Sequence, residues 1–135
     1  MKKQSILVVE DNALIVKFYR MALERQGGYK VHTTEDVDEI LRLVRSGEID
    51  LVILDISLSN AHYKNRKMDG IEIAGMIRQD PATARIPILV ATAHAMEGDR
   101  AKIIAATGAN GYLEKPIYDS KKLISEVETL LSTKE

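Results

Sequence analysis

Short apolar runs alternate along this chain with longer segments in which apolar residues recur at helical spacing. Four runs are almost continuously apolar, and they cover residues 6–9, 51–54, 88–91 and 111–114. Runs of this length, bounded by polar residues, are typical of strands buried on both faces of a parallel sheet. Residues 29–33 alternate between polar and apolar positions, which predicts a fifth strand nearer an edge of the sheet.

The segments between the runs predict five helices, because their apolar residues repeat at intervals of three and four. The apolar face of the first helix, residues 13–26, consists of Leu14, Ile15, Phe18, Tyr19, Ala22 and Leu23. The other four helices are expected from a cap at Thr34 or Asp36 to Gly47, from Asp69 to Asp80-Pro81, over residues 97–107, and from about residue 119 to 131. Five strands alternating with five helices indicate one domain, residues 1–135, with a doubly wound parallel sheet between two helical layers.

Composition removes several classes of function. The chain has 19 Lys and Arg against 20 Asp and Glu, so its net charge of -1 does not favour nucleic-acid binding. The absence of cysteine excludes disulfides, thiolate metal sites and thiol nucleophiles. No apolar stretch approaches the roughly 20 residues needed to cross a bilayer, and the run after the opening Met-Lys-Lys is too short for a signal peptide. We therefore expect a cytoplasmic protein that does not insert into membranes.

Residues with chemistry follow the strands at the points where they end. Glu10 and Asp11 follow the first run, Asp55 follows residues 51–54, Thr92 follows residues 88–91, and Lys115 follows residues 111–114. Ligands of parallel α/β sheets bind outside the carboxyl ends of the strands, where these side chains would meet. Three carboxylates, one hydroxyl and one ammonium group suit a hard divalent cation together with a phosphoryl group.

One polar segment, Ser57 to Met68, interrupts the regular alternation. It is longer than the roughly 2–6 residues usual between a strand and a helix. Its basic side chains are His62, Lys64, Arg66 and Lys67. The segment is either a solvated insertion, which costs little stability, or a basic element that contacts an acidic partner.

Five motifs stand at the strand ends and before the third helix, in one order along the chain: Glu10-Asp11, Asp55, Met68-Asp69-Gly70, Thr92 and Lys115-Pro116. Together they resemble the receiver domain of the response-regulator family of two-component signalling. The resemblance implies the flavodoxin-like form of the doubly wound fold. It also implies that a histidine kinase or a histidine phosphotransfer protein transfers a phosphoryl group to Asp55.

The resemblance and the chemistry of the carboxylates both imply Mg²⁺ as the cofactor. Magnesium takes oxygen ligands, commonly one or two carboxylates with waters and phosphate oxygens. Asp11 and Asp55 are the direct carboxylate candidates. By resemblance, the main-chain carbonyl of Ser57 is a further ligand, and Glu10 acts through a metal-bound water.

The remaining implied roles concern the phosphoryl group and the response to it. Lys115 and Thr92 would contact phosphoryl oxygens, His94 would influence the lifetime of the phosphoryl group, and Tyr112 would act with Thr92 as a rotameric switch. A downstream protein would then bind the face formed by the fourth helix, the fifth strand and the fifth helix. We expect a signalling receiver that assists its own phosphorylation and dephosphorylation, and not an enzyme with a separate substrate.

Structural interpretations of the same residues stay open at this point. Glu10 and Asp11 could favour a helix N-terminus, and Thr92 could be an ordinary β-branched strand residue. Lys115 could be a solvated surface lysine, and Tyr112 a half-buried aromatic of a strand.

Three other functions use the same fold. A Mg²⁺-dependent phosphatase acting through an aspartyl-phosphate usually has a second acid two residues after the nucleophile, where this chain has Ser57. A nucleotide- or flavin-binding module is disfavoured because neither G-x-G-x-x-G nor the P-loop pattern occurs. A protein-interaction module that is not phosphorylated would not need all five motifs.

Overall fold

Five parallel strands form one sheet in the order β2-β1-β3-β6-β7. The computed structural model describes residues 3–56, 62–63, 66–93, 99–115 and 119–132. The strands of the sheet are β1 (Ser5–Val9), β2 (Lys30–Thr33), β3 (Leu51–Asp55), β6 (Ile88–Thr92) and β7 (Gly111–Glu114). The alternating strand of the sequence, β2, lies at an edge, as predicted.

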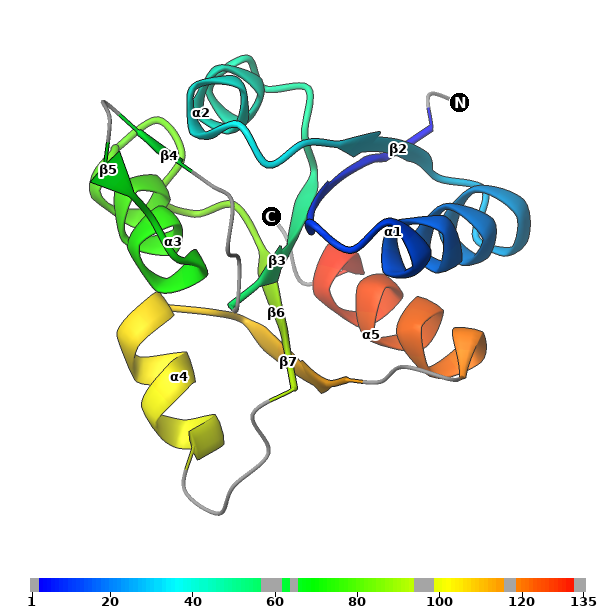
Figure 1. Cartoon of the computed structure of the whole chain (residues 1–135). Coiled ribbons are helices and arrows are strands. Elements are labelled where there is room, and N and C mark those ends of the chain that lie inside the picture. The colour runs from blue at the N-terminus through cyan, green and yellow to red at the C-terminus, as the bar shows by residue number, and fades with distance from the viewer. Residues whose placement is uncertain (1–2, 57–61, 64–65, 94–98, 116–118, 133–135) are drawn as a thin grey trace.

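Helices cover both faces of this sheet, which confirms the doubly wound α/β/α arrangement. The helices are α1 (Ala13–Arg20) with its continuation η1 (Met21–Gln26), α2 (Val37–Arg45), α3 (Gly70–Gln79), α4 (Asp99–Thr107) and α5 (Ser120–Ser132). Figure 1 shows α1 and α5 on one side of the sheet and α2, α3 and α4 on the other. Of the two predicted caps, Asp36 is the one that begins α2, since its side chain accepts a hydrogen bond from the Asp38 N–H.

Successive strand residues contribute to the two faces in turn, as the pleat of a strand requires. Ile6, Val8, Leu51, Ile53, Leu89 and Leu113 belong to the apolar cluster under α1 and α5. The residues between them, including Leu7, Val9, Val52 and Leu54, belong to the cluster under α2 and α3. A smaller cluster under α4 contains Val90 and Tyr112. The face to which a strand end points can therefore be read from the residue two positions before it.

The first helix differs from its prediction in two respects. Its second half, η1, has the wider π-helical turn, although the range of the whole helix is as predicted. The assignment of Leu14 to the core is wrong, because that side chain is 78% exposed. At about 100° per residue, Leu14 lies about 140° around the helix from the buried Tyr19, which places it at the margin of the apolar face.

The polar segment after β3 contains secondary structure that its composition did not indicate. Two short antiparallel strands, β4 (His62–Tyr63) and β5 (Arg66–Lys67), pair within it. The hairpin lies on the side of the sheet that α2 and α3 cover, away from α1 and α5 (Figure 1), and β4 contacts α2. The sequence pattern predicted a long polar segment here and gave no sign of this hairpin.

Candidate functional site

The carboxyl ends of β1, β3 and β7 bring two acids and a lysine into direct contact. The Lys115 Nζ lies 2.8 Å from Glu10 Oε1 and 3.2 Å from Asp55 Oδ1. All three side chains are largely buried, and Glu10 and Asp55 are only 2% and 4% exposed. Each residue stands two positions after a member of the cluster under α1 and α5, namely Val8, Ile53 and Leu113. The alternation of the strands thus directs all three to the same face of the sheet.

A third carboxylate completes the acidic cluster. One carboxylate oxygen from each of Glu10, Asp11 and Asp55 lies within 4.8 Å of the others. Three oxygen donors at this separation fit a hard divalent cation such as Mg²⁺. Asn12 fixes the chain beside them, since its N–H donates to Glu10 Oε2 at 3.3 Å and its side chain caps α1. Glu10 and Asp11 therefore lie in a defined turn between β1 and α1.

Burial and charge shift the pKa values of two groups in this cluster. The pKa of Glu10 is raised by burial and by the charge of Asp55, and the Lys115 ammonium only partly offsets this. Burial lowers the pKa of Lys115, but its interactions with Glu10 and Asp55 have the larger combined effect and raise it. Lys115 is therefore a permanent cation at neutral pH, held between two acids.

The segment Met68-Asp69-Gly70 brings α3 against the backbone of the central acid. Asp69 and Glu72 form a reciprocal capping box that begins the helix. Gly70 N–H donates to the Ile56 carbonyl at 3.3 Å. A Cβ on Gly70 would lie 2.8 Å from Ile56 Cα and closer still to the Asp55 carbonyl oxygen. Only glycine allows α3 to begin this near the main chain of Asp55.

Thr92 and Tyr112 lie on the opposite face of the sheet, toward α4. Thr92 is fully buried, and its carbonyl accepts a hydrogen bond of 2.8 Å from the Lys115 N–H. Tyr112 is 7% exposed, and the Arg100 guanidinium of α4 lies 5.5 Å from the centroid of its ring. This distance is within the range of a cation–π interaction. Two predicted site residues, Ser57 and His94, lie outside the described residues.

Sequence reasoning did not assign two residues that contact or approach this region. Arg100 could not be paired with Tyr112, because the contact joins α4 to β7 and has no local sequence signal. Tyr19 was placed on the core face of the first helix, which is correct, since it is fully buried. The apolar pattern alone does not reveal that its hydroxyl is buried as well.

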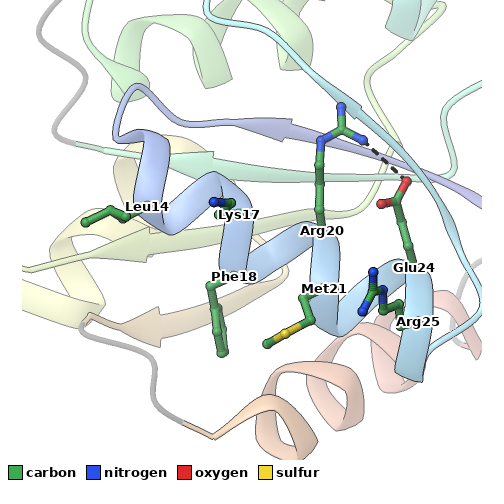
Figure 2. Close-up of a pocket in the computed structure, with 7 residues that line it drawn as sticks. All are labelled: Leu14, Lys17, Phe18, Arg20, Met21, Glu24 and Arg25. Atoms are coloured by element: carbon green, nitrogen blue, oxygen red, sulfur yellow. Dashed lines mark hydrogen bonds and ion pairs between the residues drawn. The ribbon is translucent and has the colours of Figure 1, made fainter.

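A groove lies on the outer surface of α1 and η1, and its first lining residue, Leu14, follows Asp11 by three positions in the sequence. It encloses about 480 Å³ and is lined by Leu14, Lys17, Phe18, Arg20, Met21, Glu24 and Arg25. Figure 2 shows Phe18 and Met21 projecting on one side of the helix, with Arg20 and Glu24 on the other. Leu14 and Met21 are the large apolar side chains most exposed among the described residues.

The parallel fold and the acid–lysine cluster at its strand ends define a class of protein, and comparison with its known members assigns this chain to that class. The model of the response regulator receiver domain matches residues 6–128, so the chain belongs to this family. It is a receiver domain of two-component signalling, a class of protein that accepts phosphoryl groups.

Individual relatives agree with this assignment. The polar-differentiation response regulator DivK of Brucella anthropi is 33% identical over 114 residues, or 84% of this chain and 85% of the relative. The receiver domain of the sensor histidine kinase PA1611 from Pseudomonas aeruginosa PAO1 is 28% identical, with a TM-score of 0.80, over 98% of this chain and 100% of that one. That structure has a magnesium ion coordinated in its active site cleft.

A CheY-like receiver domain protein from Methanospirillum hungatei shares the fold, with a TM-score of 0.79 at 21% identity over 98% of this chain and 97% of that one.

In the part of this chain that the structure describes, none of the helices combines the length and the apolar character needed to span a membrane.

Proposed function

We propose that Asp55 accepts a phosphoryl group from the phosphohistidine of a histidine kinase or histidine phosphotransfer protein, with Mg²⁺ as cofactor. The observation that carries this proposal is the position of Lys115, whose ammonium lies within 3.2 Å of both Glu10 and Asp55 beside a third carboxylate. A buried carboxylate with an adjacent cation and a metal-binding set of oxygens has what transfer of an anionic group requires.

The reaction exchanges one bond for another. A bond forms between Asp55 Oδ and phosphorus, the P–N bond of the phosphohistidine breaks, and the imidazole leaves with the electron pair. Bound magnesium would neutralise charge on the phosphoryl oxygens. Asp11 and Asp55 are the carboxylates we assign to the ion, with Glu10 acting through water and the Ser57 carbonyl as a further ligand. The charge of Lys115 would stabilise a phosphoryl oxygen at short range.

Thr92 and Tyr112 are the residues we assign to the response. The Thr92 hydroxyl would donate to a phosphoryl oxygen, and its movement would reach Tyr112 on the neighbouring strand, where Val90 and Tyr112 pair in the register. A downstream protein would bind the face formed by α4, β7 and α5. His94 would adjust the lifetime of the phosphoryl group. The protein would act in the cytoplasm as a signalling receiver, and not as an enzyme with a separate substrate.

The groove on α1 and η1 is the surface that we assign to the phosphodonor. Three cations line it against one acid, and that acid, Glu24, is already paired with Arg20 at 3.3 Å. The excess positive charge and the exposed Leu14 and Met21 fit a helix whose apolar face is flanked by acidic residues. Because Leu14, in the first turn of α1, lines the groove and follows Asp11 by three positions, a donor bound there would present its phosphohistidine toward the acidic cluster.

Labelling with a small phosphodonor tests the assignment of Asp55 directly. With magnesium and acetyl phosphate, intact-mass analysis should show one added phosphoryl group on an acid-stable, base-labile acyl phosphate. Asp55→Asn should abolish it, whereas Asp38→Asn, a change at an exposed acid of α2, should not. Equal labelling of Asp55→Asn and the unchanged protein would overturn the assignment.

The groove is tested by separating chemistry from docking. The double variant Leu14→Ser/Met21→Ser should take phosphoryl groups from acetyl phosphate at the unchanged rate, because it leaves the carboxylates intact. Transfer from a phosphorylated histidine kinase or phosphotransfer protein that labels the unchanged chain should slow by about 10-fold. An unchanged rate of transfer from that protein would exclude the groove as its docking surface.

A further inference from the structure

The hydroxyl of Tyr19 is a buried polar group that the proposed mechanism does not use. Tyr19 lies in α1 and its side chain has no exposed surface. Among the described residues its hydroxyl oxygen has no hydrogen-bond partner. Such orphaned hydroxyls are uncommon in native structures and call for an explanation, because a buried donor without an acceptor is costly. Phenylalanine would fill the same apolar space without this cost.

The packing of Tyr19 places it next to the acidic cluster. Its ring belongs to the apolar cluster that contains Val8, Ile53 and Leu113. Two positions further along their strands, these residues are followed by Glu10, Asp55 and Lys115, which point to the same face of the sheet. Tyr19 therefore belongs to the same apolar cluster as the residues that precede the three charged groups, on the same face of the sheet.

The direction of the side chain brings the hydroxyl nearer still. Long side chains in a helix point back toward its N-terminus, and α1 begins just after Glu10 and Asp11. The charges of Glu10 and Asp55 act on the hydroxyl, since after burial they are the causes that raise the pKa of Tyr19. The phenol is thus electrostatically coupled to both acids, and it stays protonated as a donor at neutral pH.

Glu10 has an oxygen able to accept from such a donor. Glu10 Oε1 is buried and paired with Lys115 Nζ at 2.8 Å, and a carboxylate oxygen can accept from a second donor. In the proposed function, Glu10 holds a metal-bound water, and the charge of the bound magnesium would repel the Lys115 ammonium away from Glu10. Carboxylates at metal sites are usually held by a further hydrogen bond from a neighbouring group, and Glu10 would need one when Lys115 leaves.

We propose that Tyr19 is a positioning residue, whose O–H donates to Glu10 Oε1 in the magnesium-loaded site. This inference rests on the proposed function, because it assigns Tyr19 a role only through the carboxylate of Glu10. The hydroxyl has no partner among the described residues before the site is loaded, and in the loaded site it keeps Glu10 oriented toward the metal-bound water. Tyr19 would touch neither the metal nor the phosphoryl group.

The substitution Tyr19→Phe removes only the oxygen, so it leaves the packing of the ring intact. Isothermal titration with magnesium chloride alone should show about 10-fold weaker binding than the unchanged protein. Urea unfolding without magnesium should show equal or higher stability, because the variant buries no orphaned hydroxyl. Tyr29→Phe is the matched control, since Tyr29 lies before β2 at the other end of the sheet, and it should leave magnesium affinity unchanged.

A second comparison identifies Glu10 as the partner. In a Glu10→Gln background, adding Tyr19→Phe should cause less than a 2-fold further loss of magnesium affinity, because the group that it positions has lost its charge. Unchanged magnesium affinity in Tyr19→Phe would overturn the inference, as would a full 10-fold further loss in the Glu10→Gln background. If the unchanged protein neither binds magnesium nor labels on Asp55, the proposed function itself fails, which is a distinct result.

Discussion

The strand-end edge of the sheet has two halves that differ in chemistry, and they belong to opposite faces of one sheet. The half facing α1 and α5 contains Glu10, Asp55 and Lys115, which are charged, buried and ion-paired. The half facing α4 contains Thr92 and Tyr112, which are uncharged and buried, and Tyr112 packs against apolar residues and the Arg100 guanidinium. The pleat of the strands makes this separation, because neighbouring residues point to opposite faces.

The difference between the halves shows how one small edge can serve two tasks. Transfer of a phosphoryl group needs fixed charges, and electrostatic stabilisation works best where those charges are preorganised. A response needs an element with two arrangements of similar energy, which neutral packing can provide. The halves are joined by the hydrogen bond from the Lys115 N–H to the Thr92 carbonyl. We expect a change at the acidic half to reach the α4 half through this hydrogen bond.

The largest expected effect is on magnesium affinity, which should fall when the acidic half is changed and stay nearly constant when the α4 half is changed. Asp11→Ala removes a carboxylate from the cluster and should weaken magnesium binding by about 100-fold, the upper range for perturbed metal sites. Thr92→Ala removes a hydroxyl from the other half and should leave the affinity within 2-fold. Isothermal titration of both variants measures this. Similar losses in the two variants would mean that the halves do not have separate roles.

The acidic half was largely predictable from the sequence, and the reason is the regularity of the strands. Parallel strands bring their carboxyl ends to one edge, so residues such as Glu10, Asp55 and Lys115 meet without any need to predict side-chain contacts. Their positions relative to the apolar runs were enough. The roles assigned to Ser57 and His94 stay predictions, because both residues lie outside the described part of the chain.

Other features could not be predicted, because they depend on contacts between distant elements. The contact of Arg100 with Tyr112 joins two elements whose separation no local pattern fixes. The hairpin escaped prediction because strands of two residues are too short to show a period. Leu14 was misplaced because it lies at the margin of the apolar face, where spacing alone does not distinguish buried from exposed positions.

The next effect concerns Arg78, which binds the turn after the C-terminal end of α4, remote from the site. Arg78 of α3 donates to the Gly108 carbonyl at 2.9 and 3.1 Å, to the Ile86 carbonyl at 2.7 Å and to Asn110 Oδ1 at 2.8 Å. It therefore joins α3 to the turn between α4 and β7. A planar guanidinium can make these bonds at once, and an ammonium cannot.

Replacing Arg78 should destabilise the fold without affecting the acidic half. Arg78→Ala should lower the free energy of unfolding by about 3 kcal/mol, and Arg78→Lys by about 2 kcal/mol, because several partners lose their donors. Urea unfolding followed by circular dichroism measures the loss. Arg42→Lys, at an exposed position of α2, is the control and should have no effect. A neutral result for Arg78→Lys would show that the charge of Arg78 suffices and that its geometry does not matter.

A smaller effect is expected at the contact between Arg100 and Tyr112. Arg100→Ala removes a cation–π interaction worth roughly 0.5–1 kcal/mol at exposed sites, so it should shift the population of Tyr112 toward more exposed arrangements by a few-fold. Ring resonances of Tyr112, assigned with Tyr112→Phe, would report the shift. Magnesium affinity should be unchanged, since Arg100 belongs to the α4 half.

The same spectra test whether the α4 half responds at all. On phosphorylation with acetyl phosphate, amide shifts should extend through residues 99–107 and 111–115, because Thr92 and Tyr112 face α4. Arg100→Ala should reduce the changes in residues 99–107 and leave those next to Asp55 intact. Shifts confined to residues that touch Asp55 would indicate a carrier of phosphoryl groups without a response.

The smallest effect is expected at the β4–β5 hairpin, and it tests which face of the molecule meets the phosphodonor. The hairpin lies on the side of the sheet that α2 and α3 cover. The groove is formed by residues of α1 and η1, and α1 lies on the other side of the sheet (Figure 1). Replacing residues 59–66 with a short loop should leave labelling by acetyl phosphate unchanged, because Asp11, Asp55 and Lys115 are untouched. If the donor binds the groove, its transfer rate should change by less than 2-fold at both low and high salt.

If the donor contacts the hairpin segment, the basic residues of that segment would attract an acidic donor through charges that salt screens. A loss of several-fold at low salt that disappears at high salt would therefore place the hairpin in the donor interface and extend that interface across both faces of the sheet.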